Sequence, residues 1–251
     1  MKTERIKSKH DYQIPCLHTL TGKERQVAII AHGFGSSKES PTALMLAEEL
    51  PKKGVGTLAF DFPAHGQSPV DGTELTLAHC LDDLAAAEQR ARELADHAEI
   101  SYFGSSFGAY IVLLYLSLRP HQGKKAFLRS AAVEMPKLLR PSTEEEKQAL
   151  KEHGFIMADR DYLRPLKLTK AFFGELDAHD VFSVYRAGLA QLAMVHGSND
   201  ETASPEAAIR FAQKFHAELT LIPGGDHRLS QPGMPEKVLE LAEEFFEFSD
   251  F

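Results

Sequence analysis

Residues 99–118 read EISYFGSSFGAYIVLLYLSL, an apolar strand pattern that passes through a glycine-serine turn into an apolar helical pattern. The turn carries G-x-S-x-G, a motif that holds a nucleophilic serine where a strand meets a helix. The residues two before and two after the serine must be small, because the turn is tight. Gly104 and Gly108 satisfy this rule for Ser106, whereas two phenylalanines occupy the same places around Ser105. The motif therefore predicts Ser106 as a nucleophile.

Short strand patterns alternate with helical patterns on both sides of this turn. Strands are predicted at 26–30, 54–62, 99–103, 125–129, 192–195 and 218–222, and helices at 40–50, 75–95, 106–118, 205–215 and 234–248. Ser40 and Ser204, each followed by a proline, are the expected N-caps of two of these helices. Repeated strand–helix units imply an α/β fold, with a mainly parallel sheet and helices on both faces. Residues 5–20 are expected to form two antiparallel strands at one edge.

Residues 131–190 break this alternation. We interpret the chain as one domain, residues 1–251, in which 131–190 form a lid or cap insertion, since long segments of this kind are commonly binding elements. A hairpin is predicted between FIMA (155–158) and DYL (161–163), around Asp159-Arg160. The side chains expected to contact substrate, with plain packing onto the sheet as the alternative for each, are Phe155, Met157, Tyr162, Leu163, Phe172 and Phe173.

A serine nucleophile needs a base that accepts its proton and an acid that orients the base. With a nucleophile turn of this kind, the chain order is serine, acid, histidine. HGSND (196–200) and PGGDH (223–227) each follow a predicted strand and place Asp200 and His227 on successive strand-end loops. The predicted catalytic set is therefore Ser106, Asp200 and His227. The alternative acids are Asp226, which could cap its own loop, and Asp177 and Asp180 in the insertion.

Acyl transfer also needs two hydrogen-bond donors for the developing oxyanion. The backbone N–H of Phe107, directly after the nucleophile, is one candidate. The loop HGFG (32–35) supplies the other, which we assign to the N–H of Phe34. A nucleotide-binding interpretation of this loop fails, because no G-K-[ST] follows and Lys38 stands where a dinucleotide fingerprint needs its third glycine.

Composition excludes several classes of partner. The net charge of −8, from 28 basic and 36 acidic residues, argues against a nucleic acid. The apolar stretches are too short to cross a membrane, and the charged residues 1–15 show no export signal. Cys16 and Cys80 have no metal-ligand spacing, so we expect a reduced, cytoplasmic protein with no metal and no cofactor. The sequence carries no signal of oligomeric state.

Four motifs, HGFG, GSSFG, HGSND and GGDH, resemble those of the α/β-hydrolase superfamily over residues 10–248. The run DFPAHGQS (61–68) is similar to the D-x-x-G-x-G-x-S turn of that superfamily, with Ala64 in place of its first glycine. This resemblance implies the α/β-hydrolase fold and a cofactor-free serine hydrolase. The length and the insertion are similar to those of small bacterial carboxylesterases of the feruloyl (cinnamoyl) esterase type, in which the insertion shapes an aromatic acyl pocket.

We therefore expect the substrate to be a small-molecule carboxylic ester with a small acyl or aryl group. An amide or thioester hydrolase, such as an aminopeptidase-like member of the superfamily, is the first alternative. Its substrate ammonium group would need an acidic anchor, for which the candidates are Glu134, Glu175 and Asp177. A non-catalytic binding module on a hydrolase scaffold is the second alternative, and the presence of all three triad residues argues against it.

Overall fold

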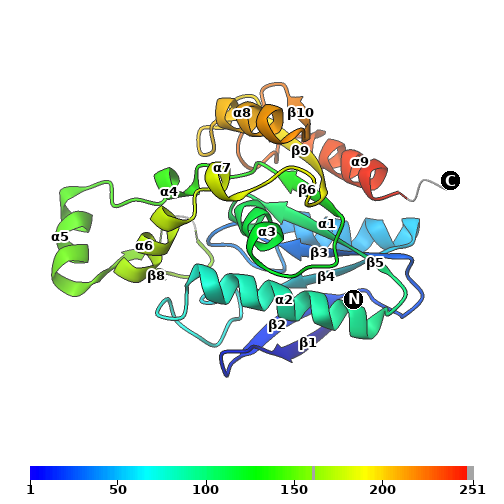
Figure 1. Ribbon diagram of the computed structural model, residues 1–251, viewed down its shortest axis with the longest axis horizontal. Coiled ribbons are helices and arrows are strands. Elements are labelled where there is room, and N and C mark those ends of the chain that lie inside the picture. Colours follow the sequence, from blue (N-terminus) through cyan, green and yellow to red (C-terminus); the bar gives the residue numbers. More distant parts are fainter. Residues whose placement is uncertain (160–161, 248–251) are drawn as a thin grey trace.

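A mixed sheet forms the centre of the protein in the computed structural model, which describes residues 1–159 and 162–247 (Figure 1). Its strands are β1 (Lys2–Lys7), β2 (Gln13–His18), β3 (Gln26–Ala31), β4 (Val55–Phe60), β5 (Glu99–Ser105), β6 (Lys125–Arg129), β9 (Gln191–Gly197) and β10 (Glu218–Ile222). Among the described residues their order is β1-β2-β4-β3-β5-β6-β9-β10. β2 is antiparallel to β1 and β4, and all other pairs are parallel. The predicted α/β fold and antiparallel edge are confirmed.

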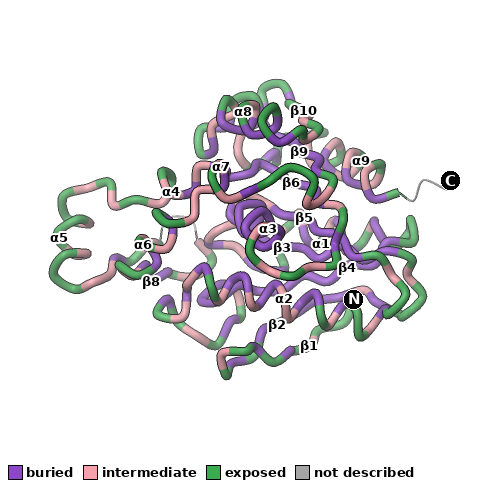
Figure 2. The backbone as a smooth tube through the Cα atoms, viewed as in Figure 1, coloured by how far each residue is buried: buried purple, intermediate pink, exposed green. Residues whose placement is uncertain are grey.

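Helices cover both faces of the sheet. They are α1 (Pro41–Glu49), the short 3-10 helix η1 (Leu50–Lys53), α2 (Leu77–Leu94), α3 (Phe107–Leu118), α8 (Pro205–Phe215) and α9 (Met234–Phe246). Successive side chains of a strand point to opposite faces. In β3, Val27 and Ile29 pack in the larger core with α2, α3 and α8, whereas Ala28 and Ile30 pack in a second core with α1 and α9. Figure 2 shows α3 buried along most of its length, as its apolar sequence requires.

The segment between β6 and β9 extends sideways from the sheet (Figure 1). It contains α4 (Met135–Leu138), α5 (Glu144–His153), β7 (Phe155–Ala158), β8 (Leu166–Thr169), α6 (Lys170–Ala178) and α7 (Val181–Val184). No residue of α5, all of which the structure describes, is buried (Figure 2). Phe172 and Leu176 of α6, in contrast, are buried in the larger core. α6 therefore helps to anchor the segment, while α5 contributes only partly buried side chains to the core.

The hairpin in this segment has a different second strand from the predicted one. β7 pairs antiparallel with β8, so the partner of 155–158 is 166–169 and not 161–163. Leu166 and Leu168 alternate with less buried neighbours, and this burial selects the second strand. Arg160 of the predicted turn, Asp161 at the start of the predicted second strand and Phe248 at the predicted end of the last helix lie outside the described residues.

Asp83, on α2, holds the turn between β1 and β2. Its carboxyl group accepts hydrogen bonds of 2.7 Å from the hydroxyls of Ser8 and Tyr12. Burial raises the pKa of Asp83 to about 6, although these two hydrogen bonds act in the opposite direction. The folded chain thus retains a proton there that the unfolded chain would release at lower pH.

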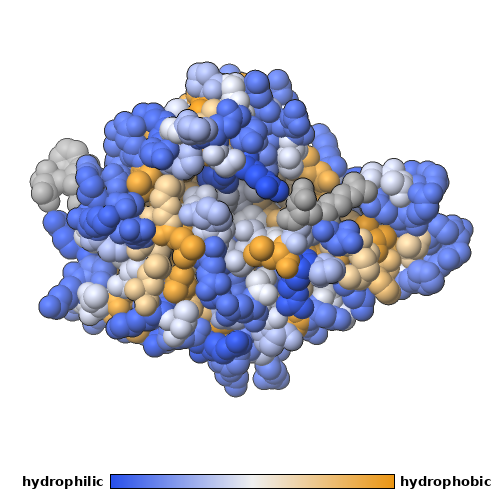
Figure 3. Space-filling model, turned by 180° about the vertical axis from the view of Figure 1, so that it is seen from behind, coloured by the Kyte–Doolittle hydropathy of each residue, from blue (hydrophilic) through white to orange (hydrophobic). Residues whose placement is uncertain are grey.

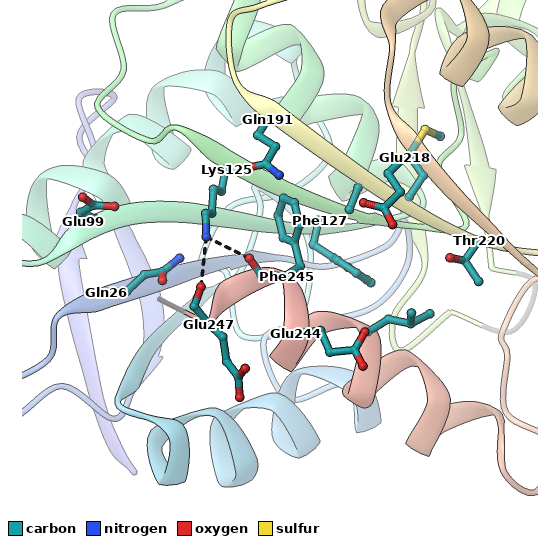
Figure 4. Close-up of a pocket in the computed structure, with 13 residues that line it drawn as sticks. Gln26, Glu99, Lys125, Phe127, Gln191, Glu218, Thr220, Glu244, Phe245 and Glu247 are labelled. Carbon is teal, nitrogen blue, oxygen red and sulfur yellow. Dashed lines mark hydrogen bonds between the residues drawn. The ribbon is translucent and has the colours of Figure 1, made fainter. Parts of the chain in front are cut away.

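A cavity of about 540 Å³ lies where the parallel strands begin (Figure 4). Lys125 donates hydrogen bonds into its wall, to the carbonyl oxygens of Phe245 at 3.1 Å and Glu247 at 3.3 Å, and thereby ties β6 to the end of α9. On the surface seen from behind, hydrophobic patches are separated by hydrophilic residues (Figure 3). No helix in the described ranges is long and apolar enough to cross a membrane.

Candidate active site

Ser106 lies in the turn between β5 and α3 with a backbone φ of +53° and ψ of −110°. A positive φ is uncommon for a residue with a side chain, and it lifts the hydroxyl out of a strand-to-helix turn. A Cβ at Gly108 would lie 2.0 Å from the carbonyl oxygen of Ala31, and one at Gly104 would lie 2.6 Å from the Cα of Ala109. Both glycines of the motif are therefore required by close backbone contacts.

His227 lies between Ser106 and Asp200. Its Nε2 is 2.9 Å from the Oγ of Ser106, and its Nδ1 is 2.8 Å from the Oδ2 of Asp200. Because a carboxylate can only accept hydrogen bonds, we assign the imidazole proton to Nδ1, which leaves Nε2 able to accept the serine proton. The structure thus brings the three side chains predicted from the sequence into one hydrogen-bonded chain.

The loops that carry Asp200 and His227 follow β9 and β10, two parallel neighbours whose carboxyl ends meet at the same edge of the sheet. The loops touch at glycines: a Cβ at Gly197 would lie 2.2 Å from the carbonyl oxygen of Gly225. That oxygen also accepts the N–H of Asn199 at 2.8 Å. The glycines before the acid and the histidine therefore permit the approach that joins them.

The carboxylate of Asp200 accepts hydrogen bonds on both oxygens. Oδ1 accepts the backbone N–H groups of Thr202 at 2.9 Å and Ala203 at 2.8 Å. Oδ2 lies 2.8 Å from His227 Nδ1 and 3.1 Å from the Nε2 of His196. Burial alone would raise the pKa of Asp200, but the hydrogen bonds from His196 and His227 outweigh it and hold the pKa well below its usual range. The carboxylate is thus ionised wherever a neutral histidine could act as a base.

His196 is a site residue that sequence reasoning did not assign. It is fully buried, and its Nε2 lies 2.8 Å from the carbonyl oxygen of Ala203 as well as near Asp200. Both partners accept hydrogen bonds, so this nitrogen carries the proton. The only signal in the sequence was its position four residues before Asp200 in HGSND, and a strand-end histidine alone does not reveal its contacts.

The alternative acids lie outside this chain of hydrogen bonds. Asp226 accepts the N–H of Leu229 at 2.8 Å, Asp180 caps the N-terminus of α7, and Asp177 pairs with an exposed arginine. Within the described ranges, no group of three or more histidine, cysteine, aspartate or glutamate side chains could hold a metal ion. Cys16 and Cys80 are buried and free.

The HGFG loop follows β3 and lies against the nucleophile turn. A Cβ at Gly33 would lie 3.6 Å from the Cβ of Ser106. The ring of Phe34 packs edge-on against the ring of Phe107, with 5.2 Å between centroids. Phe107 is the first residue of α3, and the first N–H groups of a helix have no acceptor within the helix. Aromatic packing thus fixes the backbone of both residues predicted to bind the oxyanion.

A cavity of about 670 Å³ has Ser106 and His227 in its wall. The HGFG loop and the residues after it, α1, the loop after β10 and α9 supply much of the wall, and Ser105, Arg129 and Leu163 complete it. Its charged members among the described residues are Glu39, Arg129 and Arg228, and its larger apolar members are Phe34, Met45, Leu163, Leu229 and Val238. A volume of this order is typical of small-molecule sites.

Three of the six insertion residues predicted to contact substrate lie at or near this cavity. Leu163 lines it, and its N–H donates to the carbonyl oxygen of Gly35 at 3.0 Å. Tyr162 packs so closely on Gly35 that a Cβ there would lie 2.0 Å from its ring, and its ring centroid is 5.5 Å from that of Phe34. Phe172 is buried, 6.2 Å from Phe34. Tyr162 and Phe172 thus pack against the HGFG loop.

The other three predicted contacts, Phe155, Met157 and Phe173, are not among the described residues that line the cavity. The Nζ of Lys167 lies 4.8 Å from the ring centroid of Phe155. Met157 is 52% exposed, and Phe173 packs against the larger core. Phe155 and Met157 belong to β7 and Phe173 belongs to α6, so these three side chains have surroundings other than the cavity.

The acidic residues considered as anchors for a substrate ammonium group have other partners. Glu134 pairs with Arg210 at 3.3 Å, and Glu175 accepts the N–H of Leu77 at the start of α2. Neither of these glutamates, nor Asp177, belongs to the described wall of the Ser106 cavity.

A buried ion pair lies behind the HGFG loop. The Nζ of Lys38 is 3.2 Å from the Oδ2 of Asp61, and both side chains are buried. Asp61 also accepts the backbone N–H groups of Lys38 at 2.8 Å and Gln67 at 2.9 Å, which joins this loop to the turn after β4. In that turn Ala64, at the position of a superfamily glycine, has a φ of +64° and so stores backbone strain.

The family model described as serine aminopeptidase, S33, matches residues 22–168. No curated protein matches the chain. Three solved structures have a similar fold. A protein from Agrobacterium vitis S4 has a TM-score of 0.83 and 21% identity, with 98% of both chains covered, and Est1E from Butyrivibrio proteoclasticus with ferulic acid bound has a TM-score of 0.81 and 22% identity, with 96% of this chain and 98% of that chain covered. The esterase domain of a Rhodothermus marinus protein has a TM-score of 0.73 and 22% identity, with 97% of this chain and 96% of that chain covered.

At these identities the likeness to solved structures establishes the fold, and the family model, which covers more than half of the chain, establishes membership. The chain is an α/β-hydrolase and belongs to the serine aminopeptidase family, S33.

Proposed function

We propose that this chain hydrolyses carboxylic esters with small acyl or aryl groups through an acyl-enzyme on Ser106. The observation that carries the proposal is the hydrogen-bonded chain from Ser106 through His227 to Asp200. His227 accepts the hydroxyl proton as Ser106 attacks the carbonyl carbon, and then gives that proton to the departing alkoxide. Water that His227 deprotonates then attacks the acyl carbonyl carbon, and His227 returns this proton to the departing oxygen of Ser106 as the acid is released. Asp200 orients His227 and stabilises its protonated form.

The oxyanion would bind the backbone N–H groups of Phe34 and Phe107. The position of Phe107 at the first residue of α3 supports this role, because a helix N-terminus favours negative charge. The insertion, residues 131–190, would act as a lid, since Leu163 forms part of the cavity wall.

The charges around the cavity favour an ester over a peptide with a free amino terminus. An aminopeptidase substrate brings an ammonium group, and the described wall contains Arg129 and Arg228. Its one carboxylate, Glu39, already accepts a hydrogen bond of 3.3 Å from Gln67. Two like charges would oppose ammonium binding. Est1E binds ferulic acid, so methyl ferulate is a suitable aryl ester to test.

The test combines a fluorophosphonate probe with turnover of p-nitrophenyl butyrate, methyl ferulate, a butyryl thioester and alanyl p-nitroanilide. We expect the esters to be turned over fastest. Ser106→Ala should lose more than about 10⁴-fold in kcat and escape labelling, because the nucleophile is gone. Ser105→Ala is the matched control and should still be labelled. Faster turnover of the anilide would favour an aminopeptidase, and persistent turnover by Ser106→Ala would exclude the proposed nucleophile.

A further inference from the structure

Arg129, the last residue of β6, is a buried cation that contacts the neighbours of two proposed catalytic residues. Its carbonyl oxygen accepts the N–H of Ser106 at 2.9 Å. Its Nη1 donates to the Oγ of Ser105 at 2.7 Å, and its Nη2 donates to the carbonyl oxygen of Arg228. Ser105 directly precedes the nucleophile, and Arg228 directly follows His227. One guanidinium group therefore joins the nucleophile turn to the histidine loop.

The chemistry of the guanidinium group suits this connection. Its donors project from a rigid plane in fixed directions, so two acceptors on different loops are held at a defined separation. A lysine ammonium is a single point on a flexible stem and would not hold both acceptors in one geometry. The loops joined in this way meet where Nε2 of His227 and Oγ of Ser106 are 2.9 Å apart.

A buried charge at this position carries a desolvation penalty, which argues against the interpretation that Arg129 only fills space. Arg129 is only 8% exposed. Burial lowers the pKa of Arg129 to about 10, while the carboxylates of Asp226 and Asp200 act in the opposite direction. If the space needed only to be filled, an apolar side chain would avoid the desolvation penalty.

We infer that Arg129 is a positioning residue that sets the distance between Ser106 and His227. Its effect on rate rests on the proposed function, whereas its effect on geometry does not. Arg129 also lines the cavity, so the competing interpretation is direct contact with an anionic group of the substrate.

The test uses Arg129→Met, which removes the donors and keeps an unbranched side chain as long as the arginine stem, together with Arg129→Lys and Ser105→Ala. For Arg129→Met on p-nitrophenyl butyrate we expect kcat to fall about 10–100-fold with KM within about twofold, because misplacement of reacting groups affects the chemical step. The fluorophosphonate labelling rate should fall by the same factor. Arg129→Lys should recover only part of the loss, and Ser105→Ala should lose a few-fold. Adding Ser105→Ala to Arg129→Met should cause no further loss, because the two residues share one contact.

Arg90→Met is the control for the loss of a structural arginine. Arg90 pairs with Glu4 at 3.0 Å, between α2 and β1 and away from the cavity, so kcat should stay unchanged. If Arg129→Met does not fold, Arg129→Lys and Ser105→Ala carry the test, and wild-type kcat in both would overturn the inference.

Crystal structures of the wild type and Arg129→Met separate this inference from the proposed function. We expect the Ser106–His227 distance to lengthen beyond 3.5 Å in the variant, a criterion for loss of a hydrogen bond. If the wild type turns over no ester, the proposed function fails and this distance alone decides whether Arg129 positions the pair. An unchanged distance overturns the inference, whatever happens to the rate. The inference is also overturned if the only change in Arg129→Met is a raised KM for an ester with a carboxylate in its acyl group, because that result indicates direct contact between Arg129 and the substrate.

Discussion

Replacing Asp200 by asparagine changes one oxygen of the site to an NH2 group and reverses the direction of a hydrogen bond. In the wild type, Oδ1 accepts two backbone N–H groups, and Oδ2 accepts from His227 and His196. The asparagine NH2 group must face one of these two sets of donors. Facing the backbone would leave N–H groups of the loop unsatisfied, at about 1–3 kcal/mol each. Facing the two histidines costs less, because the His227 imidazole can change its tautomer and the Nε2–H of His196 keeps the carbonyl oxygen of Ala203 as its acceptor.

The new tautomer would place the His227 proton on Nε2, which lies 2.9 Å from the Oγ of Ser106. That nitrogen could then no longer accept the serine proton, although the distances stay the same. A wrong tautomer of this kind costs about 10⁴-fold in kcat in serine hydrolysis. This factor corresponds to about 5.4 kcal/mol of lost transition-state stabilisation.

The assay is steady-state hydrolysis of p-nitrophenyl butyrate by Asp200→Asn, with the folded fraction measured by circular dichroism. Asp226→Asn is the matched control. Asp226 lies beside His227 in the chain but accepts the N–H of Leu229, so its variant should stay within about threefold of the wild type. A kcat for Asp200→Asn within tenfold of the wild type, or a larger loss in Asp226→Asn, would refute the assignment of the acid.

Three further predictions concern stability, measured by urea unfolding. Gly108→Ala should destabilise the protein by about 3 kcal/mol, because its Cβ would overlap backbone atoms of β3. Gly174→Ala, on α6 with no atom near the added Cβ, should stabilise it by about 0.5–1 kcal/mol, and equal effects of the two variants would contradict the steric argument. Lys38→Met should cost about 3 kcal/mol, because it leaves the buried Asp61 carboxylate without its cation; a cost below about 1 kcal/mol would refute this. Burial raises the pKa of Asp83 to about 6, so the free energy of unfolding of the wild type should fall as pH rises from 4 to 7, and that of Asp83→Asn should gain about 2 kcal/mol relative to it over this interval. A difference between the two proteins that stays constant with pH would exclude this titration.

Much of the sheet could be predicted because each parallel core strand is a short run rich in apolar residues, and each of them except Lys125–Arg129 ends at a glycine-bearing loop. The strand Lys125–Arg129 and the helix Pro205–Phe215 agree with the prediction at both ends. Ser204 marks the start of that helix, since its side chain accepts the N–H of Ala207. The order of Ser106, Asp200 and His227 along the chain was readable for the same reason, because each follows its own strand.

Contacts between distant side chains could not be predicted in this way. Arg129 reaches an oxygen 99 residues further along the chain, and no local pattern records such a pairing. The aromatic content of the insertion suggested substrate contacts, but Phe172 is buried in the core and only the packing of α6 decides this. The second strand of the hairpin was misplaced because LKLT is four residues long, and its partner depends on burial rather than on turn chemistry.

The order of the strands also bears on how the protein loses activity. Ser106 follows β5 in the middle of the sheet, whereas His227 follows β10, which is one of the two edge strands of the described sheet. Regions at the periphery of a fold open at lower free energy than its interior. Fraying of this one edge would displace His227, the proposed base, while Ser106, the proposed nucleophile, stays in an intact core. Inactivation would then precede global unfolding, and residual catalysis would report the integrity of one edge rather than that of the whole molecule.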